Sequence, residues 1–190
     1  MKIIDKNEYI ERYDFSNLIT EDDNKEIMRV SKEIIDSGLY FTNSPKYQTK
    51  VNLFARPEPV FLKMRQSFIY SCFMFLGREV RIKGINSWVF MTKHGDEVDR
   101  KQLWHHHHYD LEHGKISGIW YVHIPEDAGN YDESGTEFAL DGIEGNDRVM
   151  VRPGASTWIV YPSKLWHRPA LTYNKENYRF VFAADMEYLL

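Results

Sequence analysis

The sequence contains a single cysteine, Cys72, among its 190 residues. An internal disulfide is therefore impossible, which favours a reducing compartment, and we expect a cytoplasmic protein. A long apolar stretch is missing too, because the longest such run, residues 68–76, is far too short to span a bilayer. The first residues, MKIIDKNEYIERYDF, lack the apolar core of a secretory signal. These absences argue against secreted and membrane-embedded classes of protein.

The chain also has no large excess of charge of one sign, since the formal net charge is -4 with histidine neutral. Nucleic-acid binding depends largely on neutralising phosphates, so a broad nucleic-acid interface is not expected, although a local basic groove stays open. Hydrophobic residues make up 43% and aromatic residues 15% of the chain, which suits a globular protein with a β-rich core. The length fits a single domain spanning residues 1–190.

The first part of the chain, residues 1–77, has a helical pattern. Thr20 and Asp23 have the spacing of a capping box, and apolar residues recur after them at helical spacing. Gly38 is placed to end this helix in a left-handed conformation. A second helix is expected from Pro59, a residue favoured in a first turn, to Gly77. We expect these helices to support the remainder of the chain.

The second part, residues 78–190, has the pattern of a mainly β domain. Short strand-like runs are bounded by turn-forming residues, and eight of them predict a β-sandwich or jelly roll. The acidic, turn-rich residues 125–147 are expected to form a long loop, or a hairpin with an excursion, near the mouth of a site. The eight runs are EVRIKG, INSWVFMTK, QLWHHHHYD, ISGIWYVHI, TEFAL, RVMVRPG, STWIVYPS and NYRFVFAADM.

Four consecutive histidines, residues 105–108, lie in one of these runs and are followed by Tyr109 and Asp110. Side chains alternate between the two faces of a strand, so His108 and Asp110 would share a face. With His167 as a third ligand they would form the facial triad of two imidazoles and a carboxylate found in non-haem iron(II) oxygenases. Such a site keeps positions open, whereas structural zinc prefers a closed tetrahedron. The alternative is a histidine-rich surface strand without metal.

Arg179 lies in an otherwise apolar strand, NYRFVFAADM. A buried charge without a partner is costly, and a guanidinium can form two parallel hydrogen bonds with a carboxylate. We interpret the partner as the far carboxylate of 2-oxoglutarate, whose 2-oxo acid end would chelate the metal. The alternative is an ion pair with an acidic residue such as Asp185 or Glu187.

Taken in order, these segments resemble the 2-oxoglutarate/iron(II)-dependent oxygenase superfamily. The resemblance is to its small phage- and bacteria-associated prolyl-hydroxylase-like members, and it covers residues 85–186, a little over half of the chain. The segments that carry it are INSW, the histidine run before ISGIWYV, a Pro-Gly turn, WIVYPSKLWHRP and YRFVF.

The resemblance implies a double-stranded β-helix with the metal at its open end. It also implies a hydroxylase that decarboxylates 2-oxoglutarate to succinate, with iron(II) and 2-oxoglutarate as cofactors and ascorbate as an optional addition. Its metal ligands would be His108, Asp110 and His167, and Arg179 would bind 2-oxoglutarate. Tyr121 is expected either to donate a hydrogen bond to the co-substrate or to be a core aromatic.

Two departures from the family pattern leave alternatives open. The gap between the histidine run and Ser117 is longer than in this subgroup, so His106 or His107 could take the place of His108 as first ligand. Many relatives carry a small hydroxyl residue two positions after the arginine, where this sequence has Val181. One contact to the co-substrate is therefore missing or supplied from elsewhere.

Two other classes of protein compete with the oxygenase. A cupin-type metalloprotein would use His106, His108, Glu112 and His167, and a non-catalytic jelly-roll binding module or virion protein would use none of them for chemistry. For the oxygenase, the substrate stays open among a peptidyl proline, a free amino acid, a nucleobase and a small metabolite. A peptide or small molecule is favoured over nucleic acid, no membrane is expected, and an oligomer formed through the N-terminal helices stays open.

Overall fold

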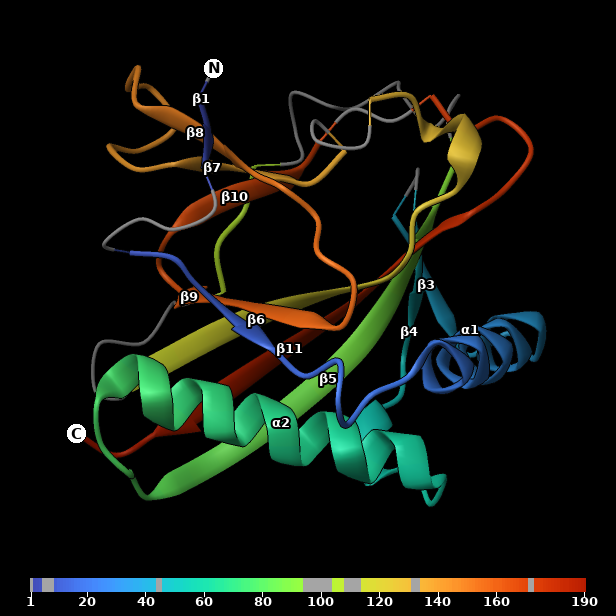
Figure 1. Ribbon diagram of the computed structural model, residues 1–190, viewed down its shortest axis with the longest axis horizontal. Helices are drawn as coiled ribbons and strands as arrows, with labels where there is room; N and C mark the ends of the chain where they lie inside the picture. The colour runs from blue at the N-terminus through green and yellow to red at the C-terminus, as the bar shows by residue number, and fades with distance from the viewer. Residues whose placement is uncertain are drawn as a thin grey trace.

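The computed structural model describes residues 2–4, 9–43, 46–93, 104–107, 114–130, 134–170 and 173–190 of the chain. Two sheets and two α-helices dominate this part of the protein (Figure 1). The helices are α1 (Glu21–Asp36) and α2 (Pro59–Leu76), with the short 3-10 turns η1 (Leu53–Ala55) and η3 (Glu126–Ala128). The strands are β1 (Lys2–Ile4), β2 (Glu11–Asp14), β3 (Tyr40–Asn43), β4 (Lys46–Thr49), β5 (Ile82–Thr92), β6 (Gly114–His123), β7 (Thr136–Ala139), β8 (Arg148–Val151), β9 (Thr157–Pro162), β10 (Trp166–Pro169) and β11 (Arg179–Tyr188).

The larger sheet has seven strands in the order β2-β9-β6-β11-β5-β4-β3, and the smaller sheet has four in the order β1-β8-β7-β10. Only β1 and β8 pair in parallel among the described strands, and every other pair is antiparallel. Both helices lie on one side of the larger sheet, and the smaller sheet lies on the other side (Figure 1). This arrangement confirms the predicted mainly β jelly roll with N-terminal helices.

Both helices begin and end where the sequence predicts. The backbone N–H of Asp23 donates to the Thr20 hydroxyl at 3.2 Å, and the backbone N–H of Thr20 donates to the Asp23 carboxylate at 2.9 Å, which completes the capping box of α1. Gly38 follows α1 with φ of 81°, and Gly77 ends α2 with φ of 65°. Both glycines adopt the left-handed conformation that a side chain disfavours, which explains the ends of the helices.

Two buried tryptophans of the larger sheet fix the helices to it. The indole N–H of Trp120 in β6 donates to the Asn24 side chain of α1 at 3.0 Å. The indole N–H of Trp158 in β9 donates to the Ser67 hydroxyl of α2 at 2.8 Å. Between them, Gly118 admits the ring of Phe68, since a Cβ on this glycine would lie 2.5 Å from that ring. The absence of a side chain at Gly118 therefore allows α2 to pack closely on the larger sheet.

Three features differ from the sequence expectation. Residues 1–77 supply strands as well as helices, because β2, β3 and β4 extend the larger sheet. The runs EVRIKG and INSWVFMTK merge into the single strand β5, and His167 lies in a strand of its own, β10. Around the histidine run, residues 104–107 form an isolated bridge to β10 in place of the expected strand. The missed strands are short. β2 and β4 pair with β9 and β5, which lie far away in the chain and are not contained in a local pattern, and β3 pairs with the adjacent β4.

The acidic segment 125–147 forms the turn η3 and then β7, which pairs with β8. It is thus a hairpin with an excursion, one of the two predicted forms. In the part of the chain that the structure describes, no helix combines the length and the apolar character that crossing a bilayer requires.

Candidate functional site

Strand β11 separates two environments by the alternation of its side chains. Phe180 and Phe182 point to the helices and belong to the larger apolar core. Arg179, Val181 and Ala183 point the other way and line a pocket between the two sheets. The pocket measures ≈ 500 Å³ including solvent at its mouth, and further lining residues are Phe90, Thr92, Ile119, Thr136, Tyr161 and Pro169.

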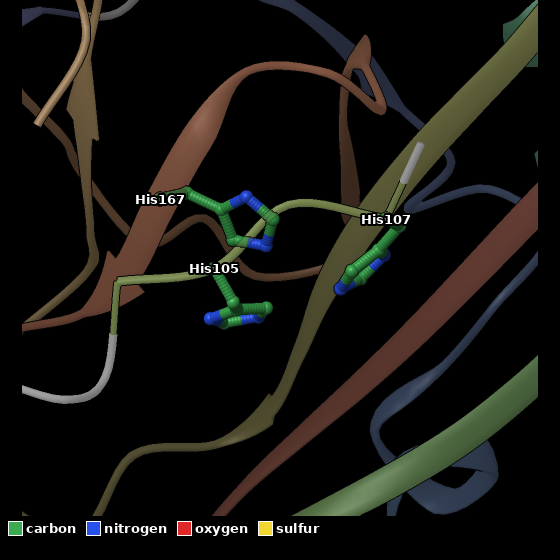
Figure 2. Close-up of side chains that lie close together, drawn as sticks. All are labelled: His105, His107 and His167. Carbon is green, nitrogen blue, oxygen red and sulfur yellow. The ribbon is translucent and has the colours of Figure 1, made fainter. Parts of the chain in front are cut away.

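Three histidines meet at this pocket, His105, His107 and His167 (Figure 2). His105 and His167 exchange backbone hydrogen bonds of 3.1 and 3.0 Å, and the backbone N–H of His107 donates to the Ser163 carbonyl at 2.8 Å. These bonds fix the histidine segment beside β10. One nitrogen from each imidazole lies within 4.8 Å of the other two, and the ring centroids are 4.2 to 5.2 Å apart.

The hydrogen bonds of His167 indicate which of its ring nitrogens would bind a metal. Its Nδ1 lies 2.9 Å from the Leu165 carbonyl, which only accepts, so Nδ1 carries the proton. Nε2 then holds a lone pair and accepts from the Tyr161 hydroxyl at 3.1 Å. Burial, followed by the charge of Asp185, raises the pKa of Tyr161, so this phenol keeps its proton.

His107 is held in the same way by a carboxylate. Its Nδ1 lies 2.9 Å from Asp185 Oδ1, so Nδ1 donates and Nε2 again keeps its lone pair. Burial raises the pKa of Asp185, but the hydrogen bond from His107, the charge of Lys115 and the Ser117 hydroxyl outweigh it and lower the pKa below its usual value. Asp185 is therefore ionised and directs the ring of His107.

This donor set fits a divalent transition metal. Imidazole is a common ligand of iron, zinc, copper and nickel, and an oxygen partner on the other ring nitrogen is the usual arrangement around such ions. Three imidazoles converge here and leave further coordination positions open. Among the described residues, no carboxylate belongs to this cluster.

Arg179 lies in the same pocket with only 2% of its surface exposed. Its two terminal nitrogens donate to the carbonyls of Gly135 and Ala170 at 3.1 and 3.4 Å, and its Nε has no hydrogen-bond partner. Burial lowers the pKa of Arg179, yet a guanidinium stays charged at neutral pH. Among the described residues, the hydrogen bonds of this buried positive charge are thus made to neutral carbonyl groups.

The predicted alternative for Arg179, an ion pair with Asp185 or Glu187, is wrong. Both carboxylates instead approach Lys115, at 3.3 and 3.7 Å. In the described ranges no carboxylate pairs with Arg179. An anion that enters the pocket would therefore find the guanidinium available.

Tyr121 lies beneath this arginine. The guanidinium carbon is 5.5 Å from the centroid of its ring, and its hydroxyl forms a 2.6 Å hydrogen bond with the Thr136 hydroxyl. Tyr121 is buried in the smaller core, so its ring packs as a core aromatic while its hydroxyl is directed to the pocket wall. Thr136 from β7 and Thr92, opposite Arg179 in β5, bring hydroxyls that Val181 lacks.

The predicted site residues fall into three groups. His167 and Arg179 lie in one pocket, as the sequence predicts. His108 and Asp110 lie outside the described residues, as does Glu112. His106 packs its ring edge-on against Trp166, with centroids 4.5 Å apart, and is not part of the histidine cluster that the cupin assignment would require.

Sequence reasoning missed His105, Tyr161 and Asp185. In an alternating strand, His105 and His107 lie on the face opposite His108. The choice of His108 as a ligand therefore excluded His105 and His107 from the same site. Asp185 could have been found from β11 alone, because it lies six residues after Arg179 and so shares its face. Tyr161 resembled a core aromatic and gave no separate signal.

No family model and no curated protein matches the sequence. Solved structures do match in fold. A prolyl hydroxylase from Trichoplax adhaerens, in complex with a hypoxia inducible factor peptide fragment, superposes with a TM-score of 0.62 at 12% identity, over 96% of this chain and 84% of that one. The protein has the oxygenase fold.

Two other solved structures extend this comparison. HygX from Streptomyces hygroscopicus, with nickel and 2-oxoglutarate bound, matches with a TM-score of 0.60 at 9% identity, over 93% of this chain and 82% of that one. SnoN, an epimerase from nogalamycin biosynthesis that depends on α-ketoglutarate, matches with a TM-score of 0.64 at 9% identity, over 93% of this chain and 75% of that one. The fold is thus the double-stranded β-helix that the sequence predicts, and it serves reactions other than hydroxylation.

Proposed function

We propose that the protein is an iron(II)- and 2-oxoglutarate-dependent dioxygenase that hydroxylates a peptidyl residue or a small metabolite. The observation that carries the proposal is the joint presence, in one pocket, of three converging imidazoles and the buried Arg179, which pairs with no carboxylate of the described residues. A metal at the histidines and a dicarboxylate reaching to the arginine would satisfy both groups. The solved structures of the same fold that bind 2-oxoglutarate support this proposal.

Iron(II) would supply the activation of dioxygen that couples decarboxylation of 2-oxoglutarate to oxidation of the substrate. The protein's own groups prepare the site for it. Leu165 and Asp185 hold the Nδ1 protons of His167 and His107, so both Nε2 atoms are presented as ligands. The apolar side chains of Ile119 and Val181 exclude water from the pocket wall.

At the other end of the pocket, Arg179 would bind the far carboxylate of 2-oxoglutarate. The Gly135 and Ala170 carbonyls already orient its terminal nitrogens, which reduces the entropy lost on binding. The Thr136 hydroxyl, held by Tyr121, would donate a further hydrogen bond. Thr92 or Thr136 would thus replace the hydroxyl that is missing at Val181.

Two ligand sets are compatible with this function. Geometry favours His105, His107 and His167, whereas the sequence predicts His108, Asp110 and His167. Both sets contain His167, and they differ in whether a carboxylate binds the metal. Asp110→Ala and His107→Ala therefore separate them.

The deciding experiment is an anaerobic titration of metal-free protein with iron(II) and then 2-oxoglutarate, followed by visible absorption. A metal-to-ligand charge-transfer band is expected, and Arg179→Met should remove it at co-substrate concentrations that saturate the wild type. Loss of the band in His107→Ala, but not in Asp110→Ala, would establish the three-histidine set. The reverse pattern would establish the set predicted from sequence.

A second candidate is a cupin-type metalloprotein that acts without 2-oxoglutarate. Such a site would use the clustered His105, His107 and His167 in place of the predicted set of His106, His108, Glu112 and His167. In the same titration this protein would bind iron and give no band when 2-oxoglutarate is added. A protein that binds no metal at all would contradict both candidates and favour the non-catalytic jelly-roll module.

A further inference from the structure

A buried polar network lies behind the histidine cluster, away from Arg179. Asp185 is at its centre with 7% of its surface exposed. Its Oδ1 accepts from His107 Nδ1 at 2.9 Å and from the Ser117 hydroxyl at 2.6 Å, and its Oδ2 lies 3.3 Å from Lys115 Nζ. Every oxygen of this carboxylate therefore has a partner.

The same network holds the backbone of His107. Ser117 lies 2.8 Å from the Ser163 hydroxyl, and the Ser163 carbonyl accepts the backbone N–H of His107 at 2.8 Å. Ring and backbone of this histidine are thus fixed by β6, by β11 and by the turn that follows β9. In the described residues 104–107 the histidine segment pairs with β10 through an isolated bridge, and this network adds to that anchoring.

We propose that Asp185 is a positioning residue for the metal centre and that it acts through His107. Because a carboxylate only accepts hydrogen bonds, it selects the tautomer in which His107 Nδ1 is protonated and Nε2 faces the pocket. Lys115 offsets the charge of Asp185, so the effect comes from the direction of the hydrogen bond and not from net charge. This inference rests on the proposed function with His107 as a ligand.

A purely structural role explains the arrangement less well. A buried ion pair is seldom more stable than apolar side chains of the same volume, so Asp185 and Lys115 are not needed for folding energy. On this face of β11, Val181 and Ala183 before Asp185 are apolar, and the next residue after it, Glu187, is far more exposed than Asp185. Asp185 thus lies at the position of β11 that is next to His107.

The test is the affinity for cobalt(II), measured by calorimetry on metal-free protein, together with the visible spectrum of the bound ion. Asp185→Ala should weaken binding roughly 10- to 100-fold and change the cobalt bands, because His107 is released from its orientation. Asp185→Asn should lose less, since its amide oxygen still accepts the Nδ1 proton. The control is Glu187→Gln, which alters the other carboxylate at Lys115 without touching His107 and should leave both readouts unchanged.

A double-mutant cycle separates positioning from general destabilisation. If Asp185 acts through His107, then Asp185→Ala should cost no further cobalt affinity in a His107→Ala background. Additive losses would overturn the proposal, and so would wild-type affinity in both Asp185 variants. If Asp185→Ala does not fold, the same double-mutant cycle is measured with Asp185→Asn.

Cobalt binding distinguishes the role of Asp185 from the metal centre itself. A wild-type protein that binds no cobalt rejects the metal centre itself. A wild-type protein that binds cobalt and forms the 2-oxoglutarate band, yet tolerates His107→Ala, remains an oxygenase and rejects only the role of Asp185.

Discussion

The two faces of the larger sheet differ in what their side chains do. The face toward the helices is apolar and aromatic, with Trp120, Trp158 and Phe182 fully buried. The face toward the smaller sheet is buried as well, yet it contains Arg179 and Asp185. Burial alone therefore does not separate the core from the site. The difference is that Trp120 and Trp158 on the helix side have side-chain hydrogen-bond partners, whereas on the pocket side no described carboxylate pairs with Arg179.

The comparison predicts that one face responds in stability and the other in binding. Phe182→Ala on the helix face should lower the free energy of unfolding by about 3–5 kcal/mol, because it leaves a cavity between Phe54, Phe61 and Trp158. Urea unfolding followed by fluorescence measures the loss. Val181→Ala, the neighbour on the pocket face, is the control and should cost less, since Val181 already borders a cavity. Equal losses would remove the distinction between the faces.

Arg179→Met should have the opposite outcome. Stability should stay the same or rise, because a buried charge with only carbonyl partners is replaced by an apolar side chain of similar length. Binding of 2-oxoglutarate to the cobalt-loaded protein should lose roughly 2–5 kcal/mol, measured by calorimetry. Cobalt affinity itself should not change. A variant that unfolds while keeping co-substrate affinity would assign Arg179 to the core.

Asn24→Ala sharpens the helix side of the comparison. The change leaves the Trp120 indole N–H buried without an acceptor, which should cost about 1–3 kcal/mol of stability. Thermal unfolding measures this effect, and metal affinity serves as the second readout. Because the indole points away from the pocket, a change in metal affinity would show that the two faces are coupled.

Tyr161→Phe should give the smallest effect and the opposite sign. The Tyr161 hydroxyl occupies the lone pair of His167 Nε2, and this hydrogen bond must break before Nε2 binds a metal. Removing it should tighten cobalt binding by about 0.5–1.5 kcal/mol, the typical value of one hydrogen bond. Calorimetry gives the measurement. Weaker binding in this variant would mean that the hydroxyl supports the metal-bound state instead.

The sequence predicts the elements better than the links between them. Thr20, Gly38 and Gly77 carry local signals, since a cap or a left-handed turn depends on neighbouring residues alone, and both helix predictions are confirmed. The placement of His167 with Arg179 followed from their order along the chain. The pairing of the histidine segment with β10 depends on residues some sixty positions apart, and local alternation does not contain it.

The candidate ligands show the same limit of local reasoning. Alternation within an assumed strand selected His108 and Asp110, whereas the described segment is anchored through Ser163 in the turn after β9 and Asp185 in β11. His107 was open as an alternative only because the spacing to Ser117 departs from the family. The ligand set predicted from the sequence stays a prediction.

Strand β11 carries Arg179 near one end and Asp185 six residues later on the same face. At about 3.4 Å per residue, the two side chains are separated by roughly 20 Å along the strand. Inserting one residue between them would turn one of the two toward the helices, so only even insertions preserve both. The distance along β11 between the pocket arginine and the carboxylate that holds His107 can therefore change only in steps of about 7 Å if both side chains are to stay on this face.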